Sequence, residues 1–402
     1  MYTLLRFSFL LSPDVNMRSI LWTMVLGSGL SVVLLIDDLE NILKEGHPTL
    51  SVRVARKRYL VYTCDDSQPC YGWGDRQRAV ASLYMLAYLT GREFRLIMTS
   101  PCDVTNFYQP HRVQWVPQGD ELITDNILTL NLVKNKNLTQ SFRKSLETGD
   151  FNSKYPQKVI YVKGNKNIYR SVSQNKVYQA AMEGWRSSAD VFRWAWGELM
   201  SPRLSLLTRL EQTVGEDILV RRGIIQKSVL PPGNLTQTSK SLLLCAHVRY
   251  GENPDNPNDQ PLTRFNMTDL PLLMEFLEKY DVDGDARLYV ASDYGLIRDK
   301  FKERFGGKVL EGVGRVIHVD RDRRSPWACE GFYVALLEQL ILSVCDHLVI
   351  TPSGFSKYAA YSSNSTHPAD MLYQAKFTKR KAGHGWKSYK GLRRRRVIKG
   401  ER

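Results

Sequence analysis

The chain has 402 residues, enough for two domains of ordinary size, and its 43% hydrophobic and 24% charged residues are typical of a globular protein. Wholesale disorder, collagen-like repeats, coiled coils and small disulfide-stapled folds are therefore excluded. The formal net charge of +15 is concentrated at one end, because residues 376–402 contain twelve Lys or Arg and one acid. The remaining chain is nearly balanced, so the basic character belongs to a tail and not to the folded part.

An apolar run near the N-terminus predicts the first element. Residues 19–36 are eighteen consecutive uncharged residues, the lower limit for a membrane-spanning helix. Basic residues precede the run and acidic residues follow it, which orients the N-terminus toward the cytoplasm. We expect a signal anchor, with residues 1–18 as a cytoplasmic tail and 37–57 as a stem. A cleaved signal peptide and a buried core helix are the alternatives.

Two further features favour the secretory pathway. The six cysteines are an even number and allow three disulfides. Cys64 and Cys70 bracket a short polar loop and can pair, whereas Cys245 and Cys345 lie in apolar runs where buried thiols are the alternative. We expect a single-pass type II protein of the Golgi or endoplasmic reticulum membrane, with its main part luminal. Four N-glycosylation sequons occur, at Asn137, Asn234, Asn266 and Asn364.

The pattern after the stem predicts a βαβ unit. Residues 58–62 are β-branched and aromatic, typical of a buried strand. A loop containing Gly72 and Gly74 follows, then apolar residues near helical spacing over 76–90 and a second strand over 94–98. Strand, helix and strand in this order predict a parallel sheet. The segment up to residue 226 is harder to interpret, apart from a helical block over about 189–210.

The βα rhythm resumes after a Pro-Pro-Gly connection at 231–233. We therefore expect two α/β domains, over residues 58–230 and 231–375, followed by the basic tail. In the second domain the patterns predict strands over 242–248, 287–291, 315–319 and 347–351, and helices over 270–280, 296–305, 331–343 and from 354.

Polar residues follow these strands, where ligands bind in doubly wound folds. His247 and Arg249 share one face of an extended segment, and a guanidinium beside an imidazole can hold a diphosphate. Ser353 and Gly354, at a helix start, offer backbone N–H groups to the same anion. Asp293 is placed to accept from ribose hydroxyls or a base amino group. Together they suggest a nucleotide-diphosphate site, although each alone also fits a solvated pair, a turn or a helix cap.

Four segments in order resemble the motifs of the GDP-fucose-dependent fucosyltransferases that make α1,2 and α1,6 linkages or fucosylate proteins. HVRYGE resembles H-x-R-x-G-D, LYVASDYG resembles the second motif, and residues 338–361 resemble the third, with its apolar helix, strand and Ser/Thr-Gly-Phe turn. Residues 71–94 resemble the family's glycine loop and helix. The turn that runs into Ala-Ala-Tyr is most similar to the α1,2 branch. The resemblance implies a GT-B-like α/β fold, with two Rossmann-like domains facing across a cleft.

The resemblance also implies roles for single residues. Glu338 would hold the guanine, but the family usually has Asp there, one methylene shorter. Glu252 likewise stands where Asp is common, and Asp75 replaces a frequent Asn. The expected donor-binding residues are His247, Arg249, Asp293, Glu338, Ser353, Gly354 and Phe355, with Gly72 and Gly74 in the glycine loop.

The implied reaction is inverting transfer of L-fucose from GDP-β-L-fucose to a glycan, such as one ending in galactose, or to a glycoprotein. Arg249 would stabilise the leaving group, and the base would be Glu252, slightly favoured, or Asp75, with Asp255 a third candidate. We expect no cofactor and no metal. D-x-D spacings at 283–285 and 320–322 fit a turn and an arginine-rich segment better than a cation site.

Other functions stay open. The chain can be a catalytically inactive relative that binds a nucleotide or glycan, or a transferase for another nucleotide sugar. The tail, with four consecutive arginines at 393–396, fits a polyanion binder. In a luminal protein, heparin-like glycans or anionic membrane suit it better than nucleic acid, and a solvated tail is the plainer interpretation.

Overall fold

A computed structural model describes residues 21–25, 31–35, 57–133, 135–226, 241–251, 264–363 and 373–374. The chain divides into two units, residues 1–56 and residues 57–402. Each is treated by itself below.

The first unit is described only within the apolar run. Strands β1 (Leu21–Val25) and β2 (Ser31–Leu35) pair antiparallel there, in keeping with the strand propensity of their Val, Trp and Thr residues. Among the residues that the structure describes, no helix is long and apolar enough to cross a membrane. The expected anchor helix is therefore not confirmed.

The second unit begins with a four-stranded parallel sheet, which confirms the predicted βαβ unit. Its strands are β3 (Tyr59–Cys64), β4 (Glu93–Met98), β6 (Ile127–Asn131) and β7 (Val159–Lys163), in the order β4-β3-β7-β6. Helix α2 (Trp73–Leu89) connects β3 to β4. Central strand β3 is almost wholly buried, which explains its continuous apolar sequence.

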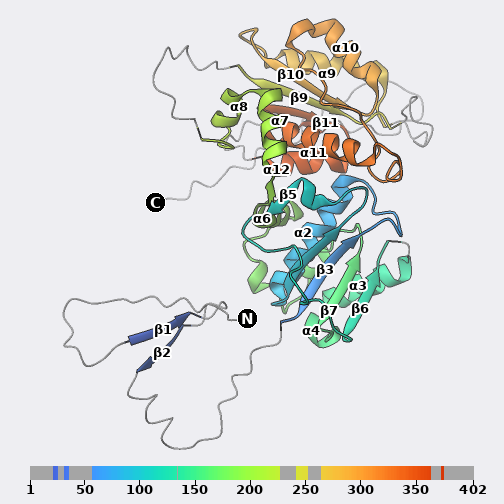
Figure 1. The fold of residues 1–402 in the computed structure, drawn as a ribbon. Coiled ribbons are helices and arrows are strands. Elements are labelled where there is room, and N and C mark those ends of the chain that lie inside the picture. Colours follow the sequence, from blue (N-terminus) through green and yellow to red (C-terminus); the bar gives the residue numbers. More distant parts are fainter. Residues whose placement is uncertain are drawn as a thin grey trace, which may run out of the picture. The chain divides into compact units, whose positions relative to one another are not determined.

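Shorter elements complete this first half (Figure 1). Strands β5 (Tyr108–Pro110) and β8 (Met200–Pro202) pair antiparallel. The predicted helical block is two helices, α6 (Ser188–Leu199) and α7 (Leu204–Val214), because β8 interrupts it. The remaining helices are α3 (Lys136–Glu147), α4 (Phe151–Lys154), α5 (Tyr169–Ser173) and α8 (Glu216–Arg221), with 3₁₀ turns at Val104–Asn106 and Ala180–Met182.

A second four-stranded parallel sheet forms the other half, in the order β10-β9-β11-β12. Most of the predicted elements are confirmed within two or three residues. The strands are β9 (Leu243–Val248), β10 (Arg287–Ser292), β11 (His347–Ile350) and β12 (Tyr373–Gln374). The helices are α9 (Leu270–Glu278), α10 (Gly295–Phe305), α11 (Ala328–Val344) and α12 (Gly354–Ser362), with 3₁₀ turns at Met267–Asp269 and Gly306–Lys308.

One predicted strand, over residues 315–319, is wrong. Val309 makes the bridge to Leu288 at the edge of β10 instead. The later segment runs without regular structure across α11, where a Cβ on Gly331 would lie 2.7 Å from Ile317 Cδ1. Its apolar alternation therefore reflects packing on a helix, which a short pattern cannot distinguish from strand pairing.

The two halves exchange helices. Although α7 and α8 precede residue 231, they contact second-half elements: Arg287 Nη1 donates to the carbonyl of Val214 at 2.6 Å, and Arg221 pairs with Asp346 at 2.6 Å. Conversely, α12 lies beside α2 and α6, as its place in Figure 1 shows.

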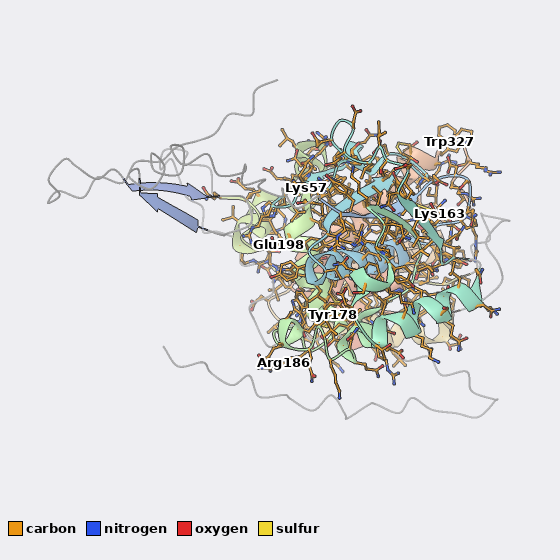
Figure 2. The ribbon with its side chains drawn as sticks, turned by 90° about the horizontal axis from the view of Figure 1, so that it is seen from below. Lys57, Lys163, Tyr178, Arg186, Glu198 and Trp327 are labelled. Carbon is orange, nitrogen blue, oxygen red and sulfur yellow. A yellow bond between two sulfur atoms is a disulfide. The ribbon has the colours of Figure 1, made fainter. Side chains whose placement is uncertain are left out.

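Covalent and polar links join the same two halves. The disulfides are Cys64–Cys70, Cys102–Cys329 and Cys245–Cys345. Cys245 and Cys345, which lie in apolar runs, are therefore paired with each other and are not buried thiols. Cys102–Cys329 connects one half to the other. Buried Gln339 of α11 accepts from Trp73 Nε1 at 2.6 Å and donates to the carbonyl of Phe355 at 2.8 Å. Side chains fill the space between the elements, while Trp327 projects half-exposed at the periphery (Figure 2).

Candidate functional site

A cavity of about 390 Å³ lies where loops of the two halves meet. Parallel strands end there, as expected for a ligand site in an open α/β sheet. The first half contributes the loop between β3 and α2, and the second contributes segments that follow β9, β10 and β11. The polar residues that line it are Asp75, His247, Arg249, Arg264, Ser292, Asp293, His318, Asp320, Arg321, Glu338 and Ser353.

His247 and Arg249 stand at the carboxyl end of β9, as predicted. The carbonyl of His247 accepts from Thr351 N at 3.1 Å, and Arg249 N donates to the Thr351 hydroxyl at 2.8 Å. These bonds align the end of β9 with the end of β11. The guanidinium and the imidazole consequently line the cavity together with Ser353.

Burial dominates the chemistry of His247. The side chain is 5% exposed, its ring lies 5.2 Å from that of Phe355, and Nδ1 has no partner within the described residues. The pKa of His247 is lowered to about 4, mainly by burial, while Asp293 raises it and Arg249 lowers it to a smaller extent. The imidazole is therefore neutral at pH 7 and presents one donor and one acceptor nitrogen.

Asp293 has a different environment from the one expected. Its carboxylate pairs with the Arg249 guanidinium and accepts from the backbone N–H of Tyr250 at 2.6 Å and of Gly251 at 2.9 Å. Those three bonds occupy the oxygens that were expected to accept from a ribose or a base. In the structure Asp293 orients Arg249 and the chain that follows β9.

Two helix N-termini meet at the cavity. Ser353 caps α12, its hydroxyl accepting from Phe355 N at 3.2 Å, and Gly72 stands at the N-cap of α2. The backbones touch at Gly74, where a Cβ would lie 2.7 Å from Phe355 N and 2.6 Å from the carbonyl oxygen of Gly354. Glycine is required there by this close approach. The positive ends of both helix dipoles thus face a space that suits an anion.

Glu338 lies in the middle of α11, inside the helix that the sequence predicted. Its buried carboxylate pairs with Arg298 of α10 and accepts from the Tyr289 hydroxyl at 3.4 Å. Burial raises the pKa of Glu338, while Arg298 lowers it. Arg298 also lines an adjoining cavity of about 450 Å³ that shares Asp293 with the first. A base bound here would meet an ion pair and not a free carboxylate.

One of the three candidate bases, Asp75, lies within the residues that the structure describes. Asp75, in the first turn of α2, lines the cavity and pairs with Arg78 at 2.5 Å. Its side chain is 37% exposed. Glu252 and Asp255 lie outside the described residues.

Sequence reasoning missed several cavity residues. Arg264 and Arg321 add two cations to Arg249, and burial lowers the pKa of His318 and of Arg321. Asp320 also lines the cavity and binds the opposite half. Basic and acidic residues after residue 319 were visible in the sequence, but nothing marked which of them face the cavity; Arg264 carried no signal.

The four predicted sequons divide between described residues and residues outside the described ranges. Asn137, in the first turn of α3, and Asn266, which caps a 3₁₀ turn, are exposed, while Asn234 and Asn364 lie outside the described residues. Within the described ranges no group of three or more His, Cys, Asp or Glu is arranged to hold a metal ion.

No protein-family model matches the chain, and neither does any curated protein. Solved structures do match. A mutant of FUT1 from Arabidopsis thaliana in complex with GDP aligns over 81% of this chain and 72% of its own, with 13% identity and a TM-score of 0.52. The α1,6-fucosyltransferase NodZ of Bradyrhizobium, soaked with GDP-fucose, aligns over 76% of this chain and 92% of its own, with 14% identity and a TM-score of 0.45. POFUT1 in complex with GDP aligns over 80% of this chain and 98% of its own, with 11% identity and a TM-score of 0.39.

At these identities the likeness is one of fold. The plant protein carries that conclusion, since its TM-score exceeds 0.5. The expected α/β fold with parallel sheets is therefore confirmed, and it is similar to the fold of this plant protein. Fold alone does not assign an activity, which has to be argued from the site.

Proposed function

We propose that this protein is an inverting glycosyltransferase that transfers L-fucose from GDP-β-L-fucose to a glycan or glycoprotein acceptor. The observation that carries the proposal is the convergence of Arg249, His247 and the α12 N-terminus on one cavity, in a fold shared with GDP-bound FUT1. Guanidinium, imidazole and backbone N–H groups are the donors that a diphosphate requires.

In this proposal the second half holds the donor. Arg249 binds the diphosphate, neutral His247 donates one hydrogen bond, and Ser353, Gly354 and Phe355 contribute the helix end. Arg264 and Arg321 add positive charge at the cavity wall. These cations supply the leaving-group stabilisation, and we propose that no metal is needed for it.

The reaction is a single displacement. The acceptor oxygen attacks the anomeric carbon, the bond from that carbon to the β-phosphate oxygen breaks, and its electron pair leaves with GDP. A carboxylate takes the hydroxyl proton. Glu252 and Asp75 remain the two leading bases, and Asp75 lies across the cavity from Arg249 on the first half. The Ala-Ala-Tyr sequence of α12 favours the galactose 2-hydroxyl as acceptor.

One observation supports a second candidate. The Arg298–Glu338 pair replaces the free acid expected beside guanine. This favours a transferase for another nucleotide sugar, or an inactive relative that still binds nucleotide or glycan.

We also propose a luminal location, in the Golgi or endoplasmic reticulum, with residues 19–36 as a type II signal anchor. Three disulfides and two exposed sequons among the described residues support an oxidising, glycosylating compartment. The basic tail would contact polyanions or anionic membrane.

The test is release of the nucleoside diphosphate by the 402-residue chain in mild detergent, GDP from GDP-fucose or UDP from a UDP-sugar, with a panel of galactose-ended glycans. GDP-mannose and UDP-galactose serve as competing donors. Release from GDP-fucose alone, increased by one acceptor, is expected. Release from another donor would support the alternative transferase, and GDP binding without turnover would support the inactive relative.

A further inference from the structure

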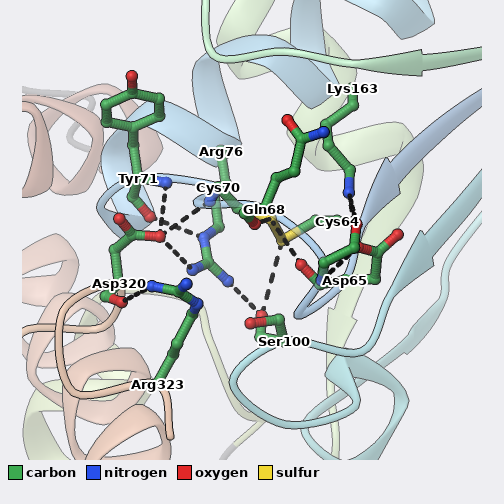
Figure 3. Close-up of a disulfide and its surroundings, with 11 residues drawn as sticks. Cys64, Asp65, Gln68, Cys70, Tyr71, Arg76, Ser100, Lys163, Asp320 and Arg323 are labelled. Carbon is green, nitrogen blue, oxygen red and sulfur yellow. Dashed lines mark hydrogen bonds and ion pairs between the residues drawn. A yellow bond between two sulfur atoms is a disulfide. The ribbon is translucent and has the colours of Figure 1, made fainter. Parts of the chain in front are cut away.

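A carboxylate from the second half binds the backbone of the first. Asp320 is 9% exposed, and its Oδ1 accepts from Cys70 N at 2.8 Å and from Tyr71 N at 3.0 Å (Figure 3). Cys70 and Asp320 are 250 residues apart in the sequence. Asp320 therefore connects the segment after residue 319 directly to the loop before α2.

The loop is shaped to receive this anion. Two consecutive N–H groups point at one oxygen because Tyr71 adopts a positive φ of 67°, the arrangement in which successive backbone amides bind anions. The Cys64–Cys70 disulfide closes the preceding turn, and Lys163 Nζ holds Asp65 within it at 2.6 Å. The loop is thus tied to its own sheet on one side and to Asp320 on the other.

Two arginines surround the contact. Arg76 is fully buried, donates from Nε to the carbonyl of Tyr71 at 2.9 Å and also bonds the carbonyl of Ser100. Its Nη2 lies 4.0 Å from Asp320 Oδ1, and Arg323 donates to the Asp320 carbonyl at 2.9 Å. Arg76 is thus a buried cation beside the carboxylate, while Arg323 holds the backbone of the same residue, and an uncharged replacement at 320 would remove an anion from beside buried Arg76.

The residues that this contact fixes form one wall of the cavity. Tyr71, Gly72, Trp73, Gly74 and Asp75 follow Cys70 directly and all line the cavity, opposite Arg249. Within the part of the chain that the structure describes, Asp320 is the side chain that accepts from the N–H groups of both Cys70 and Tyr71. A shift of the loop would move this wall, whereas His247 and Arg249 would keep their own contacts with Thr351 and Asp293.

We propose that Asp320 is a positioning residue, which holds the loop over residues 70–75 against the donor-binding half and so sets the acceptor side of the cavity. This rests on the transferase function proposed above. Asp320 acts on the rate of transfer through the loop and not on the affinity for the nucleotide, because the main groups proposed to bind the diphosphate, Arg249, His247 and the α12 N-terminus, belong to other segments.

The test compares Asp320→Ala and Asp320→Asn with a matched control, Asp346→Asn. Asp346 also accepts from a backbone N–H, that of Leu243 at 2.8 Å, and pairs with Arg221, but it touches no first-half strand or cavity residue. Three quantities are measured on the full chain: the dissociation constant of GDP by calorimetry, kcat for GDP release from GDP-fucose, and hydrogen exchange of amides 65–75.

We expect Asp320→Ala to lower kcat by about 10- to 100-fold, the range for losing hydrogen bonds to a charged group. The GDP dissociation constant should stay within about threefold, and loop amides should exchange about tenfold faster or more. Asp320→Asn keeps an acceptor oxygen and should recover part of kcat; it also serves if the alanine variant does not fold. Asp346→Asn should leave kcat and loop exchange within about twofold.

The inference is overturned if loop exchange in the Asp320 variants matches that of the Asp346 control, or if their kcat stays within about twofold of the control. An equal loss of GDP affinity and kcat also overturns it, because the role would then be in donor binding. If the wild-type chain neither binds GDP nor releases it, the proposed function fails, and loop exchange alone decides whether Asp320 holds the loop.

Discussion

The two halves of the second unit share an architecture and differ in what they place at the cavity. Each is a four-stranded parallel sheet whose strands end toward the same space. The first half presents a tightly held loop, Tyr71 to Asp75, whose glycines allow the close contact at Gly74. The second presents the cations and the imidazoles.

This difference shows that the sheet sets position and the strand-end residues set chemistry. In the first half, charged side chains near the strand ends are consumed by local pairs, as in Lys163–Asp65 and Arg78–Asp75. In the second, Asp293 orients Arg249 but leaves it lining the cavity. Among the described residues that line the cavity, the arginines and histidines therefore all come from the second half.

Removing the central cation should break the comparison most strongly. Arg249→Ala is expected to lower kcat/KM for GDP-fucose by about 10³-fold or more, since leaving-group stabilisation and diphosphate binding are lost together. GDP release and calorimetric GDP binding measure the effect.

Arg249→Lys is the matched control. It keeps the charge and the pairing with Asp293 but loses the planar fork, so an intermediate activity is expected. Near-normal turnover of Arg249→Ala, with circular dichroism unchanged, would contradict the diphosphate-binding role.

The contact between the halves gives the next largest effect. Gly74→Ala would drive a Cβ into the backbone of Gly354 and Phe355, and we expect a loss of about 1–3 kcal/mol in the free energy of unfolding. Gly72→Ala is the control, because a Cβ there meets nothing within 4 Å and its φ is −63°. Urea denaturation measures the free energy of unfolding of both variants. Equal values would mean that the two helix N-termini are less closely packed than the structure shows.

The pH dependence of stability tests the burial of the His247 imidazole in the second half. His247 has a pKa of about 4 when folded, against 6.5 in the unfolded chain. Between these values the unfolded chain binds a proton that the folded chain does not, so this contribution to stability is complete above pH 6.5 and is lost as the pH falls toward 4. The integrated effect is at most about 3 kcal/mol.

His247→Phe removes the titration while keeping an aromatic ring beside Phe355. Melting temperatures from pH 4 to 7 should fall less steeply in this variant than in the wild type. Parallel curves of melting temperature against pH would show that His247 is protonated as readily in the folded protein as in the unfolded chain.

Much of the fold could be predicted from the sequence because it depends on local patterns. The buried strand before Gly72, the helix after it and the end of β9 follow from apolar runs and turn residues. The segment over 315–319 could not, since its alternation fits a strand as well as a packed loop. The exchange of α7, α8 and α12 between the halves has no local signature.

The candidate site divides in the same way. His247, Arg249, Ser353 and the glycine loop could be named from the sequence, because strand ends and helix starts impose their own chemistry. The sequence also determined the even set of cysteines and the basic tail. Only the tertiary structure decided that Asp293 binds Arg249, that Glu338 pairs with Arg298 and that Asp320 reaches the backbone of Cys70. Those partners are separated by between 40 and 250 residues, and a carboxylate's partner is chosen by the packing of distant segments, which no local pattern records.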